Sequence, residues 1–318
     1  MTGLSQFAIE RLAYVGLTTQ DVAGLSDFFE RALGFRLLSA GWKSALEIGE
    51  QTGSASGAYR VTLGLGDEVV ELLQFDRPGR PYPDAASASD LCFQHFAIVV
   101  SNMELAYQRL CSVGRWSAIS TDGPQRLPAA SGGVTAFKFR DPEGHPLQLL
   151  AFAPGHWPDH WKVKSKSEVF LGIDHSAISV QDSARSIDFY AGLGLRIGAR
   201  SHNGGYEQQR LDGVVKPQLE VTALEPRHPT PHLQLLHYRS AVSDQKLALR
   251  NIDVAATRLV FEAAQPGPEP ARGRQAMIDP DGHHVGIVAS PDSSAAWRAG
   301  AYAKTVSDPV SANSELPR

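Results

Sequence analysis

The sequence predicts an α+β protein built from four copies of one unit, in which a strand and a helix precede about three more strands. Three features support this: a repeated strand that opens with histidine, a repeated turn, and repeated hairpins. His95 opens the β-branched run 93–100, and the helical pattern 102–111 follows. His175 opens a similar run at 173–180, again followed by a helical pattern. Repetition at this scale is the first feature to seek in a chain.

The repeated turn is an Asp-Pro-acid-Gly sequence. It occurs as Asp141-Pro142-Glu143-Gly144 and again as Asp279-Pro280-Asp281-Gly282, each time between two apolar runs. Asp accepts hydrogen bonds from the turn backbone, Pro presets φ, and Gly takes the positive φ at the end. Each turn therefore predicts a hairpin that closes its unit.

The four units are expected in the following order. The first has a strand at 12–18, a helix at 22–33 and a hairpin of strands at 59–65 and 68–75. The second and third start with the histidine strands and end with strands at 145–152 and 231–238, respectively. The fourth starts with a strand at 247–251 and continues into a helix at 254–263. In each unit, apolar residues at helical spacing distinguish the helix from the alternating or uniformly apolar strands. Aligning the strand starts places Tyr14, His95, His175 and Lys246 at one repeated position.

The domain boundaries follow from the joints between units. A Pro- and Trp-containing linker at 154–169 separates a first region, 8–153, from a second region, 170–290. The units within them are expected at 8–78, 90–153, 170–240 and 243–290, and the Ser- and Ala-rich end, 291–318, is expected to be a flexible tail. At 318 residues the chain exceeds what one core usually holds, so two domains are the default.

The composition excludes several classes of protein. The formal net charge is -4, with 42% hydrophobic and 20% charged residues, which is ordinary for a globular protein and predicts no nucleic-acid partner. No apolar stretch approaches the roughly 20 residues of a membrane span, and residues 1–6 lack a basic region leading into an apolar core, so we expect neither a membrane span nor a secretory signal. The two cysteines, Cys92 and Cys111, fit a reducing compartment, so we expect a cytoplasmic protein that acts as a monomer or homodimer on a small molecule.

The histidine strands, the helix pattern Arg185 to Tyr190 and the Asp-Pro-acid-Gly-His turns together resemble the vicinal oxygen chelate superfamily. This superfamily includes glyoxalase I, methylmalonyl-CoA epimerase, fosfomycin and bleomycin resistance proteins, and extradiol dioxygenases. The resemblance covers about residues 10 to 290. It implies that the βαβββ modules pair to form two cupped, eight-stranded mixed sheets or barrels, with metal ligands on the first and last strands of the paired modules. Carried over by position, the candidate pairs are Tyr14 and Glu71, His95 and Gln148, His175 and Gln234, and Lys246 and Gly286.

The pairing of the modules decides which candidates meet. If the middle modules pair, one cup collects His95, Gln148, His175 and Gln234, and this arrangement is favoured because it brings both histidines together. If neighbouring modules pair, Glu71 joins His95 and Gln148 instead, and supplies the carboxylate that catalysis by proton abstraction needs.

The resemblance implies two alternative functions. The first is a lyase, isomerase or dioxygenase in which a divalent cation (Fe, Mn, Zn, Ni or Co) binds a small substrate with vicinal oxygens. The second is a metal-free protein that sequesters a small molecule, like the bleomycin resistance members. Gln148 and Gln234 favour the second, because a neutral amide binds a dication less strongly than a carboxylate and cannot act as a base.

Overall fold

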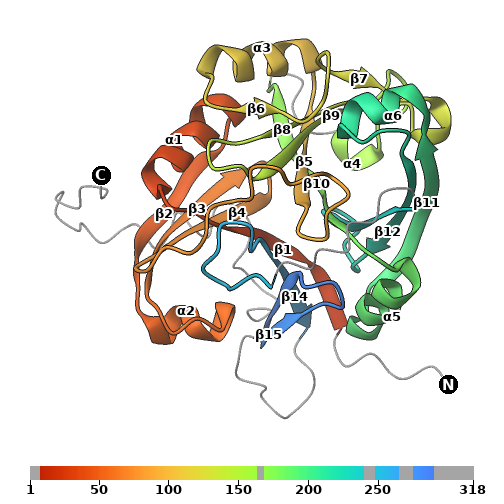
Figure 1. The fold of residues 1–318 in the computed structure, drawn as a ribbon. Coiled ribbons are helices and arrows are strands. Elements are labelled where there is room, and N and C mark those ends of the chain that lie inside the picture. Colours follow the sequence, from red (N-terminus) through yellow and green to blue (C-terminus); the bar gives the residue numbers. More distant parts are fainter. Residues whose placement is uncertain (1–7, 163–167, 240–247, 265–274, 290–318) are drawn as a thin grey trace.

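The computed structural model describes residues 8–162, 168–239, 248–264 and 275–289, which form two mixed sheets with helices around them (Figure 1). The first module contains β1 (Ala8–Thr18), α1 (Val22–Leu33), β2 (Arg36–Lys43), α2 (Ala45–Thr52), β3 (Ala58–Leu65) and β4 (Glu68–Phe75). The second contains β5 (Gln94–Val100), α3 (Met103–Val113), β6 (Ser117–Ala118), β7 (Gln125–Arg126), the 3-10 helix η1 (Ala129–Ser131), β8 (Thr135–Arg140) and β9 (Pro146–Ala151), and the short α4 (Asp159–Lys162) follows it. The third contains β10 (Phe170–Ser179), α5 (Ser183–Leu193), β11 (Arg196–Gly204), α6 (Gly205–Asp212), β12 (Gln218–Glu225) and β13 (His232–Tyr238), and the fourth contains β14 (Arg258–Ala264), β15 (Gln275–Ile278) and β16 (His284–Ala289).

Each sheet combines one module from the first half of the sequence with one module from the second half. The nine-stranded sheet has the order β11-β12-β13-β10-β5-β9-β8-β6, with β7 also paired to β8, so the second and third modules pair. The seven-stranded sheet has the order β15-β16-β14-β1-β4-β3-β2, so the first and fourth modules pair, and Figure 1 shows β14 beside β1 although they lie far apart in the sequence. The favoured pairing of the middle modules is thus confirmed. Among the described residues the strands divide as seven and nine, where eight and eight were expected.

The prediction for the start of the fourth module was wrong. The helix expected at 254–263 is instead largely strand β14, which pairs antiparallel with β1 and parallel with β16. Arg258 to Ala263 are all buried, including the charged Arg258 and Glu262, so this strand lacks the alternation of exposed and buried positions that marks a half-exposed strand. Lys246 lies outside the described residues. Arg258 occupies the repeated position that was expected for Lys246. It lies two residues before Val260, the register partner of Gly286. In the same way, His175 lies two residues before Ala177, the register partner of Gln234.

The helices begin and end at residues that explain their limits. Asp21, Asn102 and Asp182 accept hydrogen bonds from backbone N–H groups in the first turns of α1, α3 and α5. Gly34 ends α1 with φ of 75° and Gly194 ends α5 with φ of 108°, a left-handed conformation that favours glycine. Glycine thus ends the helix in both the first and the third module.

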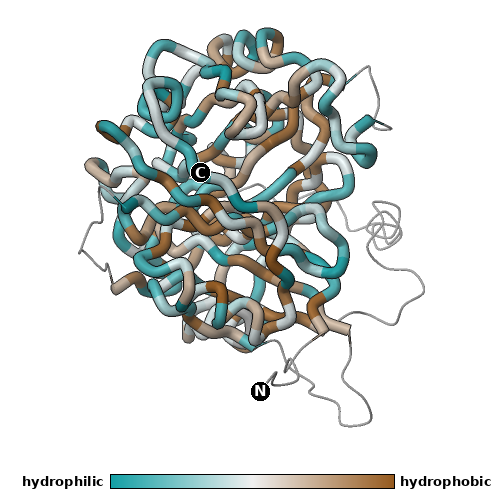
Figure 2. Tube along the Cα trace, turned by 90° about the vertical axis from the view of Figure 1, so that its right-hand side faces the viewer, coloured by the Kyte–Doolittle hydropathy of each residue, from teal (hydrophilic) through white to brown (hydrophobic). Residues whose placement is uncertain are grey.

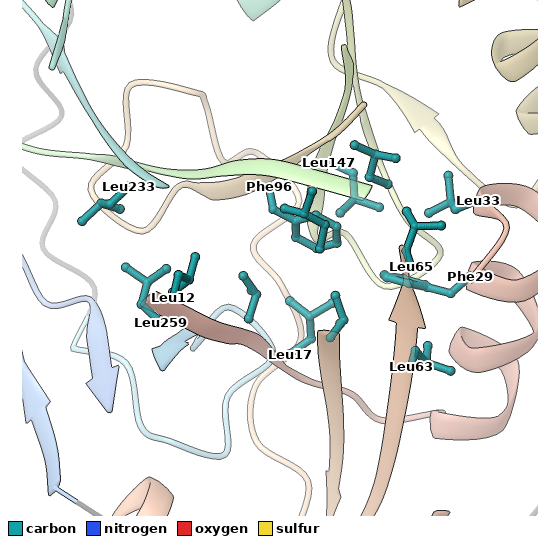
Figure 3. Close-up of a cluster of buried hydrophobic side chains, with 14 of the residues drawn as sticks. Leu12, Leu17, Phe29, Leu33, Leu63, Leu65, Phe96, Leu147, Leu233 and Leu259 are labelled. Atoms are coloured by element: carbon teal, nitrogen blue, oxygen red, sulfur yellow. The ribbon is translucent and has the colours of Figure 1, made fainter. Parts of the chain in front are cut away.

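One apolar core joins both sheets to α1, α3 and α5. Side chains of the two sheets and of α1 contribute to it, and Figure 3 labels Leu12, Leu17, Phe29, Leu33, Leu63, Leu65, Phe96, Leu147, Leu233 and Leu259 among them. Figure 2 shows hydrophobic stretches along the strands inside the molecule and hydrophilic stretches on many outer loops. Because one face of each sheet is used for this core, the opposite face of each is available for polar residues. None of the described helices is long and apolar enough to cross a membrane.

The repeated turns connect modules that the sheets do not pair. Asp141 Oδ1 accepts from the backbone N–H groups of Glu143 and His145, and the His145 ring lies 2.8 Å from Asp141 Oδ2 and 2.9 Å from the carbonyl oxygen of Thr18. In the fourth module, Asp279 organises the same turn, and His283 Nε2 lies 2.9 Å from the carbonyl oxygen of Ser179. The turns thus attach the second module to the first and the fourth to the third.

Candidate metal centre

The predicted metal ligands gather on one face of the nine-stranded sheet, which we call its cup face. On neighbouring strands, Ala177 of β10 lies opposite His95 of β5 on one side and opposite Gln234 of β13 on the other. His175 of β10 lies opposite His232 of β13. Their strand neighbours Phe96, Leu233 and Leu235 point into the common core, so these polar side chains point away from it. The ring centroids of His95 and His175 are 5.8 Å apart, and those of His175 and His232 are 5.3 Å apart. Three imidazoles therefore form a row on this face.

His95 is buried without a hydrogen-bond partner. It is 2% exposed, and neither ring nitrogen has a partner among the described residues. Burial lowers the pKa of His95 well below its ordinary value, and the charges of Lys138 and His175 lower it further. The nearby Gln148 raises this pKa, although its contact with the ring falls short of a hydrogen bond. A buried polar group without a partner costs about 1–3 kcal/mol. This neutral ring is thus suited to bind a metal or a ligand.

Asp174 reaches the histidines because β10 bulges at this residue. Neighbouring residues of a regular strand point to opposite faces, but an extra residue lies between Ile173 and His175 in the register with β5. As a result, Asp174 Oδ2 lies 2.9 Å from His175 Nδ1, and Asp174 Oδ1 accepts from Trp161 Nε1 at 3.1 Å. Burial raises the pKa of Asp174, but the hydrogen bond from His175 and the charge of His232 outweigh it and hold the pKa well below its usual range. The carboxylate is therefore ionised.

Asp174, His175 and His232 form a cluster with the spacing of metal ligands. One ligand atom from each lies within 4.8 Å of the others. Burial lowers the pKa of His232 to about 4, against the attraction of Asp174, so this ring is neutral at pH 7 and one of its nitrogens carries a lone pair. Gln234 Nε2 lies 3.1 Å from His232 Nε2. Two imidazoles and one carboxylate suit a divalent transition metal, and this donor set with open positions is typical of non-haem Fe(II) oxygenases.

The structure brings together some of the predicted residues and leaves one apart. His95, His175 and Gln234 lie in the row of rings, and Gln148 lies on the same face, opposite Ala97 in register. Glu71 lies on β4 of the seven-stranded sheet, where its carboxylate is 3.9 Å from Arg60 Nη1.

The sequence interpretation missed Asp174 and His232. His232 carried a usable signal, because a residue two positions before Gln234 on a strand shares its face. Asp174 carried none, because only the bulge turns it towards His175.

Helix α6 covers part of the cup face. Leu211 of α6 packs with Ala97, Ala136 and Leu150 of the sheet. At the end of the helix, Asp212 accepts from Lys138 Nζ at 2.7 Å, and also from Tyr238 Oη and Gln208 Nε2. Lys138 faces Gln148 in register, so a buried ion pair stands beside the predicted ligands.

Comparison with known proteins identifies the family. The model of the Glyoxalase/Bleomycin resistance protein/Dioxygenase superfamily matches residues 11–149 and 172–289. The chain belongs to this superfamily. That result confirms the resemblance found in the sequence, and the two mixed sheets agree with the fold that the superfamily implies. No curated protein matches significantly.

Solved structures of the superfamily share the architecture over nearly the whole chain. Glyoxalase I from Zea mays matches with a TM-score of 0.56 and 16% identity, over 93% of this chain and 94% of that one. A putative dioxygenase from Bacillus subtilis matches with a TM-score of 0.55 and 10% identity, over 90% of this chain and 86% of that one. Identities this low establish a shared fold.

Proposed function

We propose that this superfamily member is a divalent-metal-dependent enzyme, of the lyase, isomerase or dioxygenase type, that acts on a small substrate with vicinal oxygens. The observation that carries the proposal is the cluster of Asp174, His175 and His232. The names of the similar structures, a glyoxalase I and a putative dioxygenase, support the same chemistry.

The residues of this cluster have different chemical roles. His175 and His232 supply ring nitrogens, and Asp174 supplies a negative charge that Trp161 holds in place. A bound dication would stabilise negative charge that develops on a substrate oxygen. His95 and Gln234 border the cluster and would contribute a further ligand or a hydrogen bond to the substrate. Glu71 has no part in this arrangement, because it belongs to the other sheet.

Metal analysis tests the proposal. After exposure to Fe(II), Mn(II), Zn(II), Ni(II) or Co(II) and removal of free ions, the parent protein is expected to retain about one equivalent of one of these metals. The His175→Ala/His232→Ala variant should retain almost none. His228→Ala is the matched control, since this histidine side chain is 67% exposed, and should behave like the parent. Absence of metal from the parent, or equal retention by the double variant, refutes the proposal.

Metal-free binding of a small molecule is the second candidate. The observation that favours it is the covered cup face, where Asp212 of α6 is bound to Lys138 and amides stand at Gln148 and Gln234. A protein of this kind would bind its ligand equally well with and without a chelator. Turnover that depends on added metal would exclude it.

A further inference from the structure

Arg258 is a buried guanidinium with one unused edge. It is 3% exposed and lies on β14, opposite Gly16 of β1 and His284 of β16. Its Nη1 donates to Thr18 Oγ1 at 2.7 Å and to the carbonyl of Ala256 at 3.3 Å. Its Nε and Nη2 have no hydrogen-bond partner among the described residues. These two N–H groups form the edge that binds a carboxylate through two parallel hydrogen bonds.

The carboxylate that offsets the charge of Arg258 also lies near a second arginine. Burial lowers its pKa, and the charges of Glu71 and Tyr14 oppose this effect. Glu71, however, is also 3.9 Å from the guanidinium of Arg60, so one carboxylate serves two arginines. A buried charge without sufficient compensation is costly. An anion bound at Arg258 would remove that cost.

A cavity lies against Arg258. Its volume is about 180 Å³, and its polar lining includes Arg258, His284, Thr52 and Asn251. His284 is 7% exposed, and its Nε2 has no partner in the described part of the chain. Burial lowers the pKa of His284 to about 4, with a further contribution from Arg258, so the ring is neutral at pH 7. The rest of the lining comes from Ala276 and Ile278, from Gly53 and Gly286, and from Met277 and Val285, whose side chains pack in the common core.

The two sheets therefore carry opposite chemistry at equivalent positions. In the nine-stranded sheet, His95 on β5 and Gln148 on β9 offer lone pairs to a cation. In the seven-stranded sheet the matching positions hold Arg258 on β14 and Gly286 on β16, which offer donors and space instead.

We propose that the seven-stranded sheet holds a separate binding site for a small organic carboxylate. The unused edge of Arg258 binds the carboxylate oxygens, His284 Nε2 lies beside them, and the apolar lining accommodates a short carbon chain. A phosphate could use the same donors, so it serves as the comparison ligand.

Thermal unfolding in different anions tests this site. The metal-free protein is measured with EDTA in sodium acetate, propionate or phosphate against sodium chloride, at constant pH and ionic strength. A carboxylate at a hundred times its Kd should raise Tm by roughly 5 °C, and the rise should saturate. A protein that unfolds at the same temperature in every salt has no such site, and stabilisation by phosphate alone excludes the carboxylate assignment.

Two paired variants complete the test. Arg258→Met/Glu71→Gln removes both buried charges and leaves only the charge of Arg60, whose side chain is 23% exposed, so the variant should fold but lose the rise in Tm. Arg11→Gln/Glu262→Gln removes another arginine–glutamate pair of the same sheet, joined at 2.8 Å, and should retain the rise. An unchanged response in the first variant refutes the assignment to Arg258. His175→Ala/His232→Ala should keep the full response, so failure of the metal centre and failure of this site are distinguishable.

Discussion

At the scale of single residues, the candidate metal centre depends on how Asp174 is held. Its two oxygens are engaged separately, by Trp161 Nε1 on one side and by His175 Nδ1 on the other. Trp161 is 1% exposed and packs with Val99 and Leu171, so the indole that orients the carboxylate is itself fixed by packing. Groups that orient a metal ligand commonly affect affinity almost as strongly as the ligand itself.

Replacing Trp161 by Phe should weaken metal binding with little change in the fold. Phe fills most of the indole volume but cannot donate to Asp174 Oδ1, so we expect the Kd for the bound metal to rise about 10- to 100-fold. Competition with a chromogenic chelator measures the Kd. Trp157→Phe is the control, because Trp157 packs against Phe152 nearby. Equal affinity in Trp161→Phe and the parent would contradict an orienting role for the indole.

At the scale of elements, α6 is attached to the sheet by a buried ion pair. The side chains of Lys138 and Asp212 are 4% and 0% exposed, and the backbone carbonyl of Leu211 also accepts from Ser120 Oγ. Tyr238 and Gln208 supply the remaining donors to Asp212, so its charge is well compensated.

Breaking this pair on one side should cost more than removing both charges. Lys138→Met leaves the Asp212 carboxylate buried without its cation, and we expect a loss of about 4 kcal/mol in the free energy of unfolding. Adding Asp212→Asn, which still accepts from Tyr238 and Gln208, should recover about 2 kcal/mol. Urea unfolding of the two single variants and the double variant measures this coupling. Strictly additive losses would show that the pair does not hold α6 to the sheet.

At the scale of the whole molecule, the sheets and the turns connect different modules. The sheets pair the first module with the fourth and the second with the third, whereas the histidine turns attach the second to the first and the fourth to the third. Every module is thus joined to two others. The His145 ring is a central part of this bracing, since both of its nitrogens face acceptors, the carboxylate of Asp141 and the carbonyl of Thr18.

His145→Gln should therefore destabilise the protein in a pH-dependent way. Burial opposes the charged ring, but the charge and hydrogen bond of Asp141 raise the pKa of His145 above its ordinary value of 6.5. The stabilisation is then complete below pH 6.5 and declines as the pH rises through the raised pKa. We expect a loss of about 3 kcal/mol at pH 6 and a smaller loss at pH 9. The Tm of the parent and of the variant between pH 6 and pH 9 measures this loss of stability, and His156→Gln is the control. A loss that grows with pH would contradict a charged His145 ring.

Much of the fold was predictable because it follows from local sequence patterns. Strand alternation, helical spacing and the Asp-Pro-acid-Gly turns depend on a few neighbouring residues, so the repeated modules could be recognised from them. The same local repetition placed His95 and His175 at equivalent strand positions. Pairing of the middle modules was favoured because it alone unites these histidines, and the β5–β10 pairing confirms it.

The sequence by itself determined the repeated modules and the histidine strands; the tertiary structure decided which other groups meet them. Asp174 joins His175 only through a bulge, which depends on the register with β5. Residues 258–263 form a strand because β1 and β16 bury them from both sides, and no local alternation records that environment. Arg258 thereby takes the place expected for Lys246. Contacts between distant segments set these positions, and such contacts leave no periodic signal in the chain.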